Sequence, residues 1–149
     1  FPKWNKWIIL FFIGAQIEMS WEFYHHYHYP ENLQVWINQG KKAEDFGNHY
    51  DNFTMIRFGA IGRICQYTVV AWLGYILLQC RFIKLWSLIP IVLLSIMGII
   101  AAVLVFTYGF SLPKNVQIFF LFFIPGIPFL LLYWMGVALI SKPIVPSKS

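Results

Sequence analysis

Acidic and basic side chains that fall within apolar runs are the first candidates for chemistry in this sequence. Glu18 and Glu22 follow a run that is largely apolar from Trp7 to Ile17, and Arg63 lies near the start of a second apolar run. Ionisable groups inside a membrane are costly to bury, so they mark candidate functional sites. Such groups can form an ion pair, and a carboxyl kept protonated by apolar surroundings can act as an acid.

The spacing of these residues predicts that they meet. At the rise of an α-helix, Glu18 lies roughly 21 Å and Arg63 roughly 25 Å from the inner ends of their apolar segments. Glu18 and Glu22 are four residues apart and share a helix face, so either can pair with Arg63. Two interpretations stay open: a structural ion pair that orients two helices, or the polar end of a lipid-sized cavity with Glu18 as candidate catalytic acid.

A histidine cluster directly follows the acidic residues. Glu22 and His25 form Glu-x-x-His, and His26 and His49 are near them in sequence, so a metal site at the outer surface is a low-probability hypothesis. The alternative is an aromatic belt at the membrane surface, in which His and Tyr are common partners.

We expect no cofactor. A carboxylate-bridged two-metal bundle needs acidic residues from several helices, and haem held within a bundle needs axial ligands. The apolar segments after Arg63 contain no Asp, Glu or His, and no Ser/His/Asp arrangement or phosphate-cradling glycine loop is present. Whether the chain is an enzyme stays open at this stage.

The composition indicates a membrane protein. Hydrophobic residues make up 59% of the chain and charged residues 11%, far from the balance of soluble domains. The net charge of +5 comes from Lys and Arg scattered between apolar runs, without a basic face for nucleic acid. We therefore expect a single transmembrane domain over residues 1–149, with membrane lipid as its environment and no nucleic-acid partner.

Four apolar segments predict an all-α, integral membrane four-helix bundle. Each is long enough to cross a hydrocarbon core, which takes about 20 residues. Short links join the second segment to the third and the third to the fourth, so neighbouring helices should be antiparallel. The expected spans cover residues 4–24, 58–80, 86–110 and 116–140.

The distribution of positive charge predicts the orientation. Basic residues gather on the side that carries both termini, and the positive-inside rule places that side in the cytoplasm. The segment between the first two spans is then extracytoplasmic. Within it, Pro30 before residues 31–39 and Gly40 after them predict a short surface helix, and Val35 and Trp36 could rest on the headgroups. The basic residues of the inner side are Lys3, Lys6, Arg81, Lys84, Lys142 and Lys148.

Three sequence pieces resemble the EXPERA family, which includes emopamil-binding sterol isomerases and the sigma-two receptor. Ile17-Glu18 followed by Trp21 resembles the Ile-Glu-x-Trp of the first helix in that family. Asp51-Asn52-Phe53-Thr54 is similar to the Asp-Asn-Phe-Thr that opens the second helix of the isomerases, and Ile127-Pro128-Phe129-Leu130-Leu131 is similar to the last helix of the receptor. Together with the loop lengths, the resemblance covers most of the chain.

The resemblance implies a cavity, open to the bilayer, that holds a sterol or another flat hydrophobic ligand. Glu18 matches the acid of the first helix, and Trp134 aligns with a cavity Trp of the last helix. Gly14 stands where the isomerases have a His, Phe58 where they have a second-helix Glu, and Leu131 where an Asn is expected. Most of the proton-handling set is missing, so the resemblance favours ligand binding without full isomerase chemistry.

Three functions follow as hypotheses. The first is an EXPERA-like protein that binds a sterol or similar ligand through Glu18, Trp21, Glu22, Arg63 and Trp134. The second is an accessory subunit of a larger membrane complex, since the third and fourth spans are very apolar and the chain has few catalytic groups. The third is a metal-dependent membrane enzyme that uses the His-rich outer loop.

Overall fold

The computed structural model describes residues 5–116, 118 and 126–141, and these residues are almost entirely helical. The all-α prediction is therefore confirmed. The long helices are α1 (Asn5–Tyr27), α4 (Phe53–Gln79) and α5 (Leu85–Tyr108), and α7 (Gly126–Ile140) is shorter. Between α1 and α4 lie α2 (Tyr29–Asn38), the 3-10 turn η1 (Ala43–Asp45) and α3 (Phe46–Tyr50), and η2 (Gly109–Ser111) follows α5.

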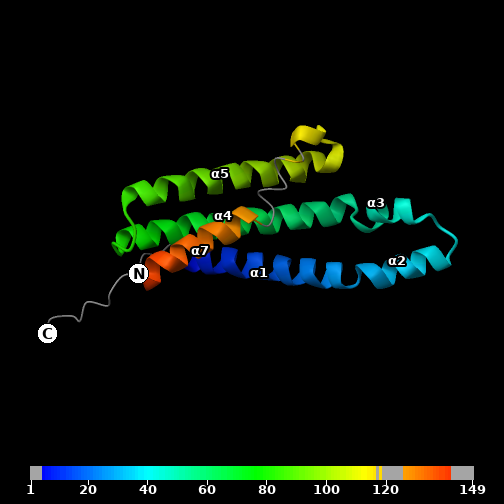
Figure 1. The fold of residues 1–149 in the computed structure, drawn as a ribbon, viewed down its shortest axis with the longest axis horizontal. Coiled ribbons are helices and arrows are strands. Elements are labelled where there is room, and N and C mark those ends of the chain that lie inside the picture. The colour runs from blue at the N-terminus through cyan, green and yellow to red at the C-terminus, as the bar shows by residue number, and fades with distance from the viewer. Residues whose placement is uncertain (1–4, 117, 119–125, 142–149) are drawn as a thin grey trace.

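Helix α4 is the central element of the fold. It packs most extensively on α5 and α1, and α7 lies mainly on α4 with fewer contacts to α5. Figure 1 shows α5, α4 and α1 as long rods side by side, with α2 and α3 extending past the end of α5. We refer to residues 29–50, which comprise α2, η1 and α3, as the cap.

Small residues allow the central helices to approach closely. Tyr67 of α4 is 1% exposed and lies directly over Gly98 of α5, where a side chain on the glycine would collide with the ring. Further along, a Cβ on Gly74 would stand 2.9 Å from Cγ2 of Ile91. Between apolar helices in lipid, such close van der Waals packing is a main source of association.

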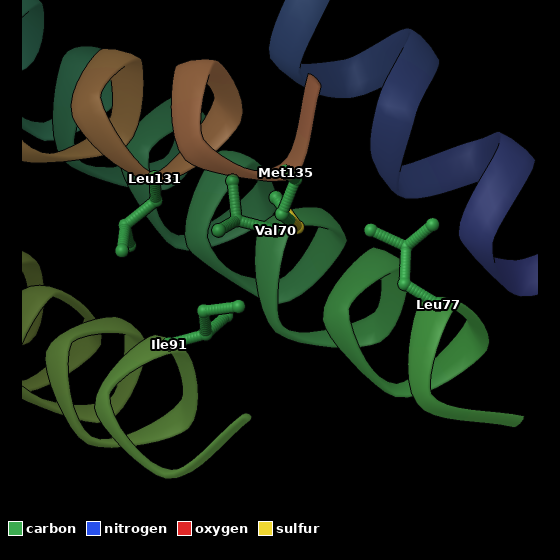
Figure 2. Packing of buried hydrophobic residues seen from close by; sticks show 5 residues of the cluster. All are labelled: Val70, Leu77, Ile91, Leu131 and Met135. Carbon is green, nitrogen blue, oxygen red and sulfur yellow. The ribbon is translucent and has the colours of Figure 1, made fainter. Parts of the chain in front are cut away.

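The second packing centre joins three helices. Val70 and Leu77 come from α4, Ile91 from α5, and Leu131 and Met135 from α7, and all five are buried together. Figure 2 shows these side chains meeting between the three helices. Leu131, which stands where the resemblance expects an Asn, is thus a core residue and 1% exposed.

Two helices, Thr54–Gln79 and Leu85–Tyr108, are long and apolar enough to cross a membrane. They support an association with a membrane. Helix α1 spans 23 residues but carries Lys6, Glu18 and Glu22, and it falls short of the same apolar composition. Helix α7 is apolar but has 15 residues, and residues 117 and 119–125 of the expected fourth span lie outside the described part of the chain.

Local signals explain the ends of the other elements. The expected surface helix is present as α2, with Pro30 in its first turn and Gly40 in the left-handed region, at φ 76°, just after it. The second long helix begins at Phe53, whereas the expected span began at residue 58. The helix starts earlier because the side chain of Asn52 accepts hydrogen bonds from the backbone N–H groups of Thr54 and Met55. Asn52 is therefore the N-cap of α4.

Candidate functional site

Glu18, Trp21 and Glu22 of α1 lie on the face of that helix that contacts α4. Within α1, Ala15 and Glu18 are buried, and Trp21, Glu22 and His25 are half-buried, at a spacing of three to four residues. This spacing is that of one helix face. The opposite faces, with Ile9, Phe12 and Ile17, are half or more exposed. The candidate site is thus the seam between α1 and the N-terminal half of α4.

Glu18 lies in a notch formed by two glycines of α4. It is 3% exposed, and a Cβ on Gly62 would overlap its Cβ, Cγ and Cδ atoms. A Cβ on Gly59 would stand 3.5 Å from its Oε1. Within the part of the chain that the structure describes, this Oε1 is buried without a hydrogen-bond partner. An unsatisfied buried polar atom costs about 1–3 kcal/mol, so it requires an explanation.

Arg63 pairs with Glu22. Its Nη2 donates to Oε2 of Glu22 at 2.5 Å, and its Nη1 donates to Oε1 of Gln66 at 2.9 Å. The Arg63 side chain is 12% exposed and that of Glu22 is 30% exposed. Of the two acids that the spacing allowed, Glu22 therefore forms the ion pair across the helices.

His25 connects α1 to the junction between α3 and α4. Its Nε2 lies 3.0 Å from Oδ1 of Asp51, and the hydroxyl of Tyr50 donates to its backbone oxygen at 2.9 Å. The imidazole stacks on the ring of Tyr50 at 4.0 Å and on that of Trp21 at 5.1 Å. Trp21 in turn meets the edge of Phe58 at 5.0 Å. Three ring contacts and two hydrogen bonds thus fix the C-terminal end of α1.

The four candidate metal ligands do not converge on one point. His26 lies 3.9 Å from Oε1 of Glu22, His25 pairs with Asp51, and His49 stacks on Trp36 at 4.6 Å. Among residues 5–116, 118 and 126–141, no three His, Cys, Asp or Glu side chains form a group able to hold a metal ion. The structure therefore does not assemble Glu22, His25, His26 and His49 into one site.

Trp134 is not part of the same cluster. It lies on α7, is 41% exposed, and is one turn from Leu131, which packs at the level of Val70. Val70 is eight residues beyond Gly62 on α4, or roughly 12 Å along the helix. Glu18, Trp21, Glu22 and Arg63 are brought together, and Trp134 lies closer to the level of the C-terminal half of α4.

The sequence did not single out Gln66 and did not predict the pairing of His25 with Asp51. Gln66 lies three residues after Arg63, and this spacing is the signal that could have identified it as a partner. The ring of Trp36 packs within the cap against Phe46 and His49, and its contact with headgroups stays a prediction.

Comparison with protein-family models, with curated proteins and with solved structures gives no match for this chain. The likeness to the EXPERA family therefore rests on the three short sequence pieces alone.

Proposed function

We propose that this chain is a four-span membrane protein that binds a sterol or a similar flat hydrophobic ligand within the bilayer. Glu18 is the polar anchor for the ligand, the termini are cytoplasmic, and the cap is extracytoplasmic. The protein acts by binding, without full isomerase chemistry.

The unpartnered oxygen of Glu18 carries this proposal. If the acidic residues of α1 served only to orient two helices, the pair of Glu22 and Arg63 would be sufficient. Glu18 remains, buried in an apolar bundle, and Arg63 is already bonded to Glu22 and Gln66. A ligand hydroxyl that donates a hydrogen bond to Oε1 would satisfy this oxygen and offset the cost of its burial.

The distance between Glu18 and Trp134 suits an elongated ligand. A flat molecule with its hydroxyl at Glu18 and its long axis along α4 would extend toward the inner half of the bundle, at the level of Leu131. Trp134, partly exposed on α7 beside that level, offers an aromatic surface for the apolar end.

Two positions argue against isomerase chemistry. Gly14 has no titratable side chain, and a Cβ added there would stand 3.4 Å from Sγ of Cys65. Phe58 is an aromatic contact of Trp21. Proton transfer in a membrane site needs a second group that can take or give a proton near the first, and Glu22, one turn from Glu18, is committed to Arg63.

The experiment is retention of a sterol by the purified protein. The chain is purified in mild detergent, incubated with a radiolabelled sterol, and assayed for bound label, and co-purified lipids are identified by mass spectrometry. We expect Glu18→Gln to lower the affinity about tenfold, since hydrogen bonds to charged groups contribute about 1.5–3 kcal/mol.

Glu31→Gln is the matched control, because Glu31 is an exposed carboxylate on α2. It should retain the affinity of the wild type. If the protein holds bulk bilayer lipid alone, or if both substitutions act equally, the proposal is wrong.

An accessory subunit is the second candidate, and the wide exposed surface of α1 favours it. Ile9, Leu10 and Ile17 are each 58% exposed on faces that α4 does not cover. A partner helix would cover these side chains. Native mass spectrometry of the protein extracted from its own membrane distinguishes the two candidate functions. An accessory subunit is detected at the mass of a complex with its partner, and a sterol-binding monomer is detected alone.

A further inference from the structure

The cap contains a second candidate site, separate from Glu18. A groove of about 200 Å³ lies between α2 and the segment that leads through η1 into α3. This volume is below the roughly 300 Å³ at which pockets for drug-sized ligands begin. The groove therefore fits a small group, about the size of a lipid headgroup.

Three side chains that line the groove carry hydrogen-bond donors without a protein acceptor. Lys41, His49 and the amide of Gln39 line it, and across the described residues none of them donates a hydrogen bond to another side chain or to the backbone. Lys41 Nζ lies 4.1 Å from the centre of the Trp36 ring, and His49 stacks on the same ring at 4.6 Å. Trp36 thus holds two cationic or potentially cationic groups at one place.

The remaining polar groups of the groove are already bonded. Asn32 donates to the backbone oxygen of His28 and to the hydroxyl of Tyr50, and the indole N–H of Trp36 donates to the backbone oxygen of Lys42. No carboxylate lines the groove, although the cap contains Glu31, Glu44 and Asp45. The free donors and the local charge therefore favour an anion.

The occupied ring of Trp36 argues against a sugar. Carbohydrates would need an open aromatic face for stacking, and Lys41 and His49 already contact this ring. A phosphate group fits better, because it presents three acceptor oxygens and up to two negative charges to a set of clustered donors.

We propose that the groove lined by Gln39, Lys41 and His49 binds a phosphate group, carried either by a lipid headgroup or by a soluble phosphomonoester. Lys41 supplies the fixed charge, and His49 and Gln39 supply directional donors. The site is independent of Glu18 and of the sterol proposal.

Two titrations distinguish the sources of phosphate. The chain in neutral detergent is titrated with glycerol 3-phosphate by calorimetry, and it is separately incubated with phosphatidic acid or phosphatidylcholine and examined by native mass spectrometry. Binding of glycerol 3-phosphate identifies a soluble ligand, and selective retention of phosphatidic acid without it identifies a headgroup. If neither probe binds, the proposal is wrong.

Lys42→Gln is the control for Lys41→Gln. Both remove one positive charge from the same loop, but the side chain of Lys42 does not line the groove, and its backbone acceptor for Trp36 is kept. We expect Lys41→Gln to weaken binding about tenfold, as for loss of a charge-assisted bond, and Lys42→Gln to leave it nearly unchanged. Equal losses in the two variants would indicate diffuse attraction and overturn the proposal. Glu18→Gln should bind phosphate as the wild type does.

Discussion

Gly62 sets the distance at which α1 passes α4. Because Gly62 has no side chain, the side chain of Glu18 packs directly against the backbone of α4. Helix α1 is then close enough for Glu22, one turn further on, to reach Arg63. The distance between the backbones of α1 and α4 at Gly62 therefore decides which of the two carboxylates pairs with the guanidinium of Arg63.

Gly62→Ala should destabilise the protein by about 1–3 kcal/mol, because the new methyl group overlaps the side chain of Glu18. Combining it with Glu18→Ala should restore only part of the loss, since Cγ and Cδ of residue 18 are then absent but its Cβ still overlaps the new methyl group. Thermal unfolding in detergent measures both. Gly136→Ala on α7 is the control, since no atom lies within 4 Å of its added Cβ. A neutral Gly62→Ala would contradict the close approach of the two helices.

The arrangement of Glu18 and Glu22 was only partly predictable from the sequence. The i, i+4 spacing predicted that Glu18 and Glu22 share a face, the helical rise predicted that Arg63 lies at a similar depth, and the contact between Arg63 and Glu22 agrees with both. Spacing alone could not decide which acid pairs, because the answer depends on the shape of the facing helix. The pairing of His25 with Asp51, 26 residues later, likewise depends on how the cap folds back.

At the scale of elements, the cap is a small unit with an aromatic core of its own. Phe46 is 2% exposed and meets the rings of Tyr29 and Tyr50, each at 5.0 Å, and that of Trp36 at 5.8 Å. These contacts join α2 to α3, which are too short to be stable helices alone.

Phe46→Ala should open the cap, because removing a buried aromatic ring costs about 3–5 kcal/mol. Hydrogen exchange is the measurement: backbone amides of α2 and α3 should exchange much faster, and those of α5 should keep their protection. Ile37→Ala, at a side chain that is 43% exposed on α2, should change little. If α5 loses protection as well, the cap and the bundle unfold together and this description of the cap is wrong.

The elements themselves were largely predictable. Pro30 and Gly40 bracket α2 as expected, and uncharged runs gave α5 and most of α4. The expected membrane span began at residue 58, whereas α4 begins at Phe53, where the resemblance had placed the opening of the second helix. In the fold, Asn52 caps the helix and Arg57 donates to the backbone oxygen of Phe106 at 3.1 Å, so tertiary contacts support a helix that composition does not.

The side-chain ion pairs of the described residues gather at one end of the molecule. The ion pair, the His25 pair and the cap all lie toward the C-terminal end of α1, while the cluster around Val70, Leu131 and Met135 is apolar. This asymmetry agrees with the proposed orientation, in which the cap faces the extracytoplasmic side.

Cysteine labelling tests that orientation. In a background with Cys65→Ser and Cys80→Ser, a membrane-impermeant maleimide should label Lys42→Cys from the extracytoplasmic side, because the cap is exposed there. With Cys65→Ser alone, the exposed native Cys80 should react only after the membrane is opened. Labelling of Lys42→Cys solely from the cytoplasmic side would show that the orientation is the reverse of the one proposed.

The dependence of α1 on α4 has a consequence for biosynthesis. In the described part of the chain, α4 is the helix of the bundle on which α1 packs, and the cap separates the two in sequence. The ribosome therefore releases α1 with Glu18 and Glu22 before Arg63 and Gly62 have been made. If α1 crosses the bilayer as proposed, the insertion machinery would have to keep these carboxyl groups away from lipid until α4 is synthesised, so completion of α4 would commit the first helix to the bilayer.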